Sequence, residues 1–201
     1  MSTCGAIFAG HAADCNTRTK AGAEQTVLLF NREDIDLGTT VVDSTEGASG
    51  THKISTFQLK AGKTGYKFQG LGDKQHIADL FEFIRNEEGY NEFAHRLRLR
   101  LYGLSETDMV TLKGLAKGAN LVAMVESKSK GANNADAFRV LGFDAGLKLQ
   151  EAVYDTNENT GQMPLVLSSI EPDLESNPPY IYFDTDYATS KAAFDLAFAQ
   201  P

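Results

Sequence analysis

The most regular pattern in the chain runs from His95 to Tyr102, where polar and apolar residues alternate without a break. The alternation yields two faces: Arg96, Arg98 and Arg100 on one, and Leu97, Leu99 and Leu101 on the other. Successive side chains of a β-strand point to opposite sides, so the pattern predicts a strand. Its leucine face should lie against a core, and its arginine face should point away from that core.

Shorter patterns of the same kind recur along the chain. Apolar runs and β-branched stretches predict further strands at 25–31, 39–43, 52–59, 64–69, 120–126, 137–141, 146–154 and 163–169. Residues 77–85 are ambiguous, because their apolar positions fit a helical stripe as well as a strand face. A turn near Gly89 would make this segment the hairpin partner of the arginine strand, and we favour that interpretation.

Two helices are expected. Ser105 can accept a backbone N–H at a helix start, with Asp108 three residues later, and Gly118 supplies a stop signal. The second helix should span 185–199, capped by Asp184 or Thr185. Its apolar side is formed by three aromatic residues, which are Tyr187, Phe194 and Phe198.

Eight to ten short strands and two helices, without an alternating strand–helix rhythm, predict a mainly β protein. We expect a β-sandwich or a partly open β-barrel with a flanking α-helix. No internal repeat or low-complexity linker divides the chain, so residues 1–201 should form one domain. Residues 1–23 are small and polar without a sustained period, which predicts an extended N-terminal arm that needs a surface to lie against.

Composition narrows the possible functions. The hydrophobic fraction of 42% is enough for a core. The longest apolar run, 121–125, is far shorter than the roughly 20 residues of a membrane-spanning helix, so no membrane insertion is expected. The net charge is −8, and residues 151–201 hold nine acidic side chains against Lys191 alone. Such a chain is poorly suited to wrapping nucleic acid by phosphate neutralisation.

Catalytic signatures are weak. The segment 61–64, Ala-Gly-Lys-Thr, resembles the end of a phosphate-binding loop, but Phe57 stands where that loop needs glycine. The carboxylate pairs Asp34/Asp36 and Asp184/Asp186 sit beside turn and cap signals. No serine or cysteine lies in a glycine-flanked nucleophile turn. We therefore expect no enzyme activity and no cofactor.

Metal and disulfide signals are similarly weak. The four histidines do not fall at metal-ligand spacing from one another, so no metal site is expected. Cys4 and Cys15 could form a bridge that pins the arm, or remain free thiols in a reducing compartment. Both possibilities stay open.

The arginine face is the one charged set with regular geometry. It is either a solvated surface or a contact for carboxylates of its own or a neighbouring chain, with the acidic last quarter as the complement. Phosphate binding conflicts with the net charge. The candidate subunit-interface residues are Arg96, Arg98, Arg100, Asp184, Asp186 and Tyr187.

Several segments resemble the major tail tube proteins of tailed bacteriophages. They are 137–152, 157–161, 163–169, 121–126 and 183–191, together with Cys4-Gly5, Cys15 and Gly22 ahead of 28–31. The resemblance is scattered over most of the chain, and 60–95 takes no part in it.

This resemblance implies a structural virion protein. Six copies would close into a ring whose inner strands form one continuous barrel, and the rings would stack into a tube. The phage genome would pass through the lumen without specific binding. The partners would be further copies and other tail proteins, in a tail assembled in the bacterial host cytoplasm. The inner tubes of contractile injection and secretion systems share this fold.

Other classes fit part of the same pattern. A capsid decoration or head–tail joining protein would share the acidic β composition but would form trimers or a single ring. A small-ligand-binding β-barrel would be a monomer with a pocket lined by its own side chains. Open-ended assembly, which requires sheet edges that pair with neighbours, separates these classes from a tube subunit.

Overall fold

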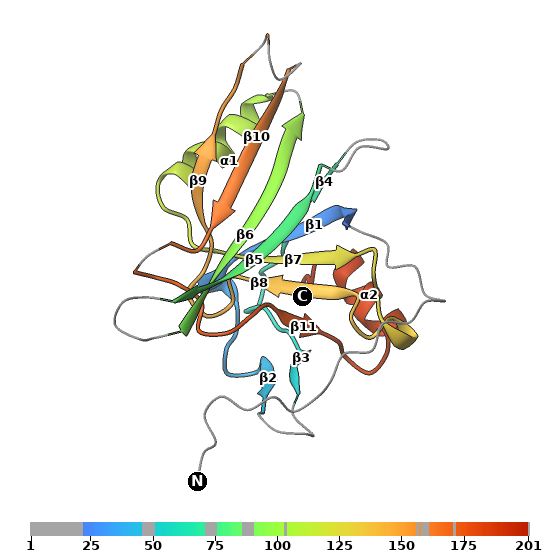
Figure 1. Cartoon of the computed structure of the whole chain (residues 1–201). Coiled ribbons are helices and arrows are strands. Elements are labelled where there is room, and N and C mark those ends of the chain that lie inside the picture. Colours follow the sequence, from blue (N-terminus) through green and yellow to red (C-terminus); the bar gives the residue numbers. More distant parts are fainter. Residues whose placement is uncertain are drawn as a thin grey trace.

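The computed structural model describes residues 22–45, 51–70, 76–85, 91–102, 104–155, 157, 161–170 and 172–200. Two β-sheets pack against each other, with one helix beside each (Figure 1). The sheets remain separate, so the fold is a β-sandwich with a flanking helix and not a closed barrel.

The larger sheet has seven strands in the order β2-β3-β11-β8-β7-β1-β4. Their bounds are β1 (Ala23–Asn31), β2 (Val41–Ser44), β3 (His52–Thr56), β4 (Tyr66–Gln69), β7 (Leu121–Ser127), β8 (Phe138–Leu141) and β11 (Tyr180–Tyr182). All neighbours pair antiparallel except β3 and β11, which run parallel.

The smaller sheet has four antiparallel strands in the order β5-β6-β10-β9. These are β5 (Ala78–Arg85), β6 (Asn91–Tyr102), β9 (Lys148–Ala152) and β10 (Gln162–Ser168). The strand interpretation of 77–85 is confirmed, because β5 pairs with β6 from Ala78↔Arg98 to Arg85↔Asn91.

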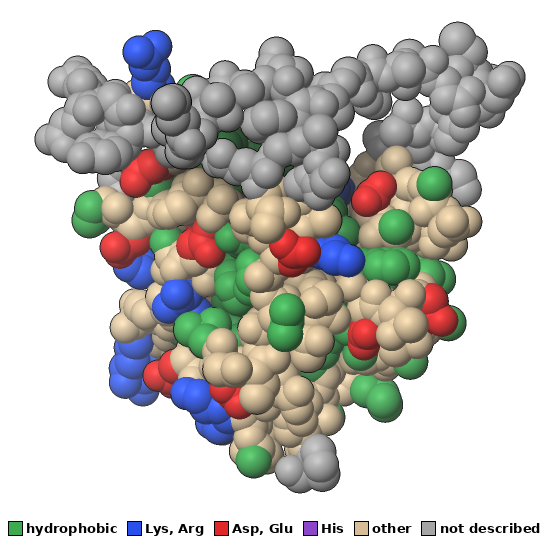
Figure 2. All heavy atoms as spheres, turned by 90° about the horizontal axis from the view of Figure 1, so that it is seen from below, with side chains coloured by type: hydrophobic (Ala, Val, Ile, Leu, Met, Phe, Trp, Pro, Cys, Tyr) green, Lys and Arg blue, Asp and Glu red, His purple; other side chains and the backbone are tan. Residues whose placement is uncertain are grey.

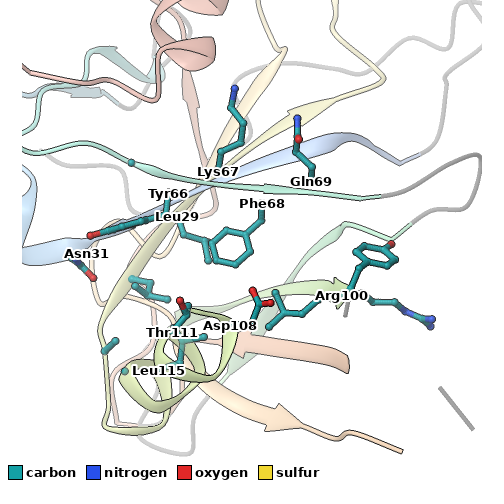
Figure 3. Close-up of a pocket in the computed structure, with 16 residues that line it drawn as sticks. Leu29, Asn31, Tyr66, Lys67, Phe68, Gln69, Arg100, Asp108, Thr111 and Leu115 are labelled. Carbon is teal, nitrogen blue, oxygen red and sulfur yellow. The ribbon is translucent and has the colours of Figure 1, made fainter. Parts of the chain in front are cut away.

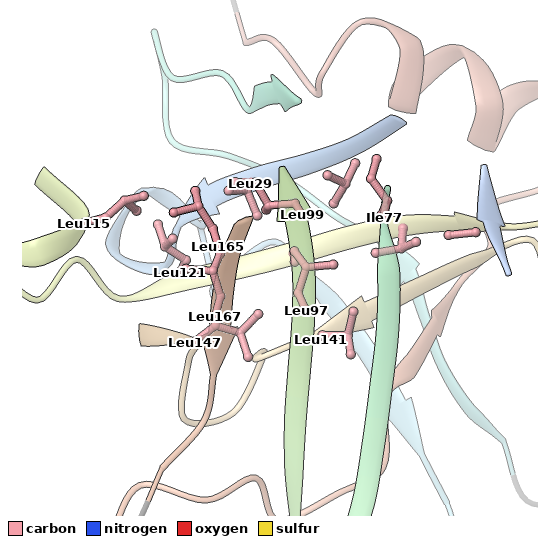
Figure 4. Packing of buried hydrophobic residues seen from close by; sticks show 14 of the residues in the cluster. Leu29, Ile77, Leu97, Leu99, Leu115, Leu121, Leu141, Leu147, Leu165 and Leu167 are labelled. Carbon is pink, nitrogen blue, oxygen red and sulfur yellow. The ribbon is translucent and has the colours of Figure 1, made fainter. Parts of the chain in front are cut away.

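The first hydrophobic core fills the space between the two sheets (Figure 4). The predicted leucine face of β6 is part of it, with Leu97, Leu99 and Leu101 all buried. Leu165 and Leu167 of β10 join them, opposite side chains of β1 and β7. The alternation along β6 therefore sends its arginines to the outer side of the smaller sheet.

A second core lies on the other side of the larger sheet, under helix α2 (Tyr187–Asp195). Phe138, Tyr182 and Phe194 are each no more than 2% exposed. Their rings contact one another at centroid distances of 5.0 and 6.2 Å around Phe138. The layers thus run from the smaller sheet through the first core to the larger sheet, the second core and α2.

Helix α1 (Glu106–Ala116) has the predicted capping box, in which Ser105 accepts from the Asp108 backbone and the Asp108 carboxylate accepts from the Ser105 backbone. It is the longest helix among the described residues. No helix in that part of the chain is long and apolar enough to cross a membrane. Two short 3-10 turns lie at Arg32–Asp34 and Ala132–Asn134.

The second helix is shorter than predicted. Its cap is Asp186 and not Asp184 or Thr185, because the Asp186 carboxylate reaches the Thr189 N–H at 2.7 Å. It ends at Asp195 instead of continuing to 199, since Ala197 and Phe198 take positive φ values of 51° and 52°. That conformation turns the chain and seats Phe198 in the second core.

Candidate assembly surfaces

The outer face of the smaller sheet carries the predicted arginine stripe. Arg98 sits between Ala78 of β5 and Val166 of β10, while Arg100 donates a 3.1 Å hydrogen bond to Gln162 Oε1. Arg98 and Arg100 are exposed and Arg96 is half-buried. Within the described residues no ion pair joins any of the three to a carboxylate of the same chain. Pairing with carboxylates of a neighbouring chain stays a prediction.

A shallow hollow of about 570 Å³ crosses this face. Arg96 and Arg98 line its centre, with Glu82 on β5 at one side and Glu151 on β9 at the other. Glu151 of β9 is the register partner of Val166 of β10, and Val166 is in turn the partner of Arg98 of β6. Two strand spacings of about 4.8 Å therefore separate the acid from the arginine. The positive stripe is thus bordered by acids without being neutralised by them.

The two edges of the smaller sheet, β5 and β9, each pair on one side only in the described structure. Edge β5 exposes Leu80, Phe81 and Phe83, the last to 56%. Edge β9 leads directly into Val153 and Tyr154, both about half exposed. Open edges with apolar side chains are surfaces to which another strand can add. On the face seen in Figure 2, by comparison, apolar and charged side chains are interspersed.

The acidic interface candidates lie elsewhere. Asp186 caps α2, and Asp184 accepts a hydrogen bond from Thr185 through its side chain. Tyr187 donates to Glu126 at 2.8 Å and stacks on Phe138. Because α2 and the arginine face are on opposite outer layers, one chain does not bring the two groups of candidates together.

Sequence reasoning missed the role of Glu126, which lies within the buried strand β7. Its carboxylate is 4% exposed and forms ion pairs with Lys130 at 2.6 Å and Lys191 at 3.3 Å. Burial opposes ionisation, but the hydrogen bonds from Lys130 and Tyr187 outweigh it and lower the pKa of Glu126. This network fastens α2 to the sheet. The detectable signal was a single acid in the otherwise apolar segment 121–126.

A second buried group, the Glu175 latch, consists of Glu175, His95 and the loop 142–146. The fully buried Glu175 carboxylate accepts from the backbone N–H groups of Asp144, Ala145 and Gly146 at 2.8–3.1 Å. Its own backbone pairs with Phe93 of β6 at 2.8 and 2.9 Å. The latch therefore ties the smaller sheet to the loop that follows β8 of the larger one.

His95 completes the Glu175 latch from β6. It is 1% exposed, and its Nδ1 accepts from the Gly142 N–H at 3.1 Å. Burial lowers its pKa to about 4, so the ring is neutral near pH 7. Burial raises the pKa of Glu175, although the three backbone donors hold it down in part.

A groove of about 860 Å³ opens between edge strand β4 and helix α1 (Figure 3). Its interior is apolar, with polar side chains around it. The apolar lining residues include Leu29, Phe68, Leu101, Leu115 and Leu121, and the polar ones include Asn31, Arg100, Asp108 and Thr111. The groove exposes one end of the first core, and no local sequence pattern indicated it.

The segment resembling a phosphate-binding loop is a turn between β3 and β4. Lys63 forms a 2.8 Å ion pair with Asp34, and Asn31 donates to the same carboxylate. These contacts lower the pKa of Asp34, the Lys63 hydrogen bond first. No three His, Cys, Asp or Glu side chains gather as a metal site in the parts of the chain that the structure describes. Cys4, Cys15 and most of the predicted arm lie outside those parts.

Comparison with protein-family models, with curated proteins and with solved structures finds no match for this chain.

Proposed function

We propose that this protein is a structural subunit of a bacteriophage tail tube, in which six copies form a ring and the rings stack. The observation that carries this proposal is the four-stranded sheet with two edges unpaired in the described structure: β5, which bears exposed apolar side chains, and β9, which leads directly into Val153 and Tyr154. The resemblance of scattered segments to tail tube proteins supplies the context. In that context the subunit assembles in the host cytoplasm, joins other tail proteins in the virion, and surrounds the path of the genome.

The physical argument concerns what an open edge does. A strand with unpaired N–H and C=O groups is a template for another strand, and soluble monomers shield such edges with charges, bulges or covering segments. Here β5 presents the exposed apolar side chains Phe81 and Phe83 on either side of Glu82. If β9 of one copy pairs with β5 of the next, the contact is heterologous, so it repeats until rotation closes a ring.

The arginine stripe bears on the orientation of the subunit. A lumen lined by Arg96, Arg98 and Arg100 would present about eighteen guanidinium groups per six-fold ring, and phosphate contacts in such number bind DNA tightly. We therefore place this stripe against carboxylates of a neighbouring subunit. A genome can then slide through the lumen without specific binding.

Electron microscopy combined with light scattering tests the proposal. The wild-type chain should form six-fold rings and stacked tubes. Replacing Phe81 and Phe83 of β5 together with lysine should keep the chain folded but monomeric, because lysine protects an edge. The matched control is Leu196→Lys, a 72% exposed leucine beyond α2, which should assemble normally.

Each alternative class predicts a different image. Trimers or isolated rings that never stack would favour a capsid decoration or head–tail joining protein. A wild-type chain that stays monomeric at high concentration would overturn the proposal. Tubes surrounded by a contractile sheath in the intact particle would indicate the inner tube of an injection or secretion system.

A further inference from the structure

The groove between β4 and α1 is large enough to receive a side chain from another molecule. All four residues of β4 line one wall, and α1 forms the other with Asp108, Thr111, Gly114 and Leu115. In Figure 3, Phe68 points into the space while Lys67 points away from it. A Cβ built on Gly114 meets nothing within 4 Å, so the helix leaves room at the middle of the groove. A volume of this order accommodates several side chains.

The same chain presents an apolar pair that is about half exposed. Val153 and Tyr154 directly follow β9 and are 48% and 47% exposed. Neither residue lines the groove. The two surfaces therefore do not cover each other within one chain, and their mutual burial requires a second copy.

The pair suits the groove in polarity. A tyrosine combines an apolar ring with a hydroxyl that needs a partner when buried, and the groove combines an apolar floor with the polar side chains of Asn31 and Thr111. Phe81 and Phe83 suit it less well, because pairing with β6 fixes them within a strand. Val153 and Tyr154 lie beyond the last residue of their strand.

The charges around the two surfaces are also complementary. Glu151 and Asp155 flank the apolar pair. Arg100 lines the groove, against one carboxylate, Asp108, which is already held by Ser105. Charges arranged in this way favour one partner orientation over others.

We propose that Val153 and Tyr154 of one copy insert into the groove between β4 and α1 of the next copy. The inserted and receiving surfaces are different parts of the chain, so the contact is heterologous and can propagate from copy to copy. This inference rests on the proposed function, because it names a contact by which subunits of the ring hold one another.

Two single variants test the insertion, one on each surface. Tyr154→Asp removes the inserted ring, and Gly114→Phe adds a ring to obstruct the receiving groove, at a position where a Cβ meets nothing within 4 Å. Each should weaken self-association by about 30-fold, the scale of a lost interface hot spot. Val110→Asp, on the outer side of α1 and away from the groove lining, should associate as the wild type does. Circular dichroism verifies folding, and Thr111→Lys replaces Gly114→Phe if the latter misfolds.

Mixing the two variants gives the sharpest result. Each retains the surface that the other lacks, so a mixture should form a one-to-one dimer that cannot grow, visible by analytical ultracentrifugation. No dimer in the mixture would overturn the insertion. Normal rings from both single variants would also overturn it while leaving the ring proposal intact.

A peptide covering residues 150–155 separates the two proposals when the wild-type chain is monomeric. Binding of this peptide to the wild type but not to Gly114→Phe, measured by fluorescence anisotropy, would support the insertion even if six-fold rings never form. Equal binding to both proteins, or to neither, would overturn it.

Discussion

The two sheets of this sandwich differ in what covers their outer faces. The larger sheet lies under α2, and Phe138, Tyr182 and Phe194 form a closed core there. Within the described residues no helix covers the arginine face of the smaller sheet, and Arg98 points outward from it. The first face is completed within the chain, whereas the second leaves its edges and charges for water or for a neighbour. Stability should therefore depend on the first face and association on the second.

The largest expected effect tests the covered face. Phe194→Ala should lower the free energy of unfolding by about 3–5 kcal/mol, because it removes a fully buried ring and leaves a cavity. Urea denaturation followed by circular dichroism measures this loss. The matched control, Phe83→Ala on the open edge, should cost much less, about 1 kcal/mol, since that residue is 56% exposed. Equal losses at the two positions would remove the distinction between the faces.

The link between the two sheets provides the next test. Glu175→Ala leaves three buried backbone N–H groups without their acceptor, and each unsatisfied group costs about 1–3 kcal/mol. We expect a loss of about 3 kcal/mol or more in urea denaturation. Asp173→Ala, which removes a half-exposed carboxylate paired with Lys148, should change stability by about 1 kcal/mol at most.

Acid should weaken the same link through His95. Its pKa is about 4 when folded and 6.5 when unfolded, so the unfolded chain takes up the proton first as the pH falls. The contribution of neutral His95 to the free energy of unfolding is complete above pH 6.5. It is lost as the pH drops towards 4, by about 3 kcal/mol in all. Glu175 acts in the opposite direction, since its raised pKa favours the folded state on protonation.

Unfolding free energies measured from pH 7.5 to 4 check this expectation. The wild type should lose stability more steeply than His95→Gln, whose neutral amide can still accept from the Gly142 N–H. Parallel curves for the two proteins would show that His95 carries no such pH dependence.

The smallest expected effect on stability belongs to the open face. Arg98→Glu should change the unfolding free energy by no more than about 0.5 kcal/mol, because the side chain is exposed and makes no ion pair within the described chain. It should nevertheless reduce ring formation seen by light scattering. Lys117→Glu, on an exposed residue after α1, is the matched charge reversal. A charge reversal at Lys63 would not be a matched control, because it would break the ion pair between Lys63 and Asp34.

The sequence predicted best those elements that are determined by neighbouring residues. The alternation along β6 and the capping box of α1 are encoded within a few neighbouring residues, and both are confirmed. The strand β5 was ambiguous alone and is settled by its partner β6. Strand β11 was missed, because three residues are too few to show an alternating pattern. Its strand conformation depends on pairing with β3 and β8 on either side.

The assembly surfaces and the latch were harder to predict, because they join residues that are distant in sequence. The arginine stripe lies within one strand, so the alternation in the sequence was enough to predict it. Glu175 lies between β10 and β11, and the backbone N–H groups that it accepts from are about 30 residues away. The groove combines β4 with α1, and only the packed fold brings their side chains to one space.

The position of β11 has a consequence for synthesis. This strand follows β3 and β8 in the sequence, yet it inserts between them and joins the β2–β3 hairpin to the rest of the larger sheet. Translation proceeds from the N-terminus, so a nascent chain that has emerged only past β8 lacks this strand and leaves β3 and β8 unpaired there. The larger sheet can close only after residue 182 has emerged. Until then a nascent subunit presents two unpaired strand edges, on β3 and β8, and each is a template to which a strand of another copy can add.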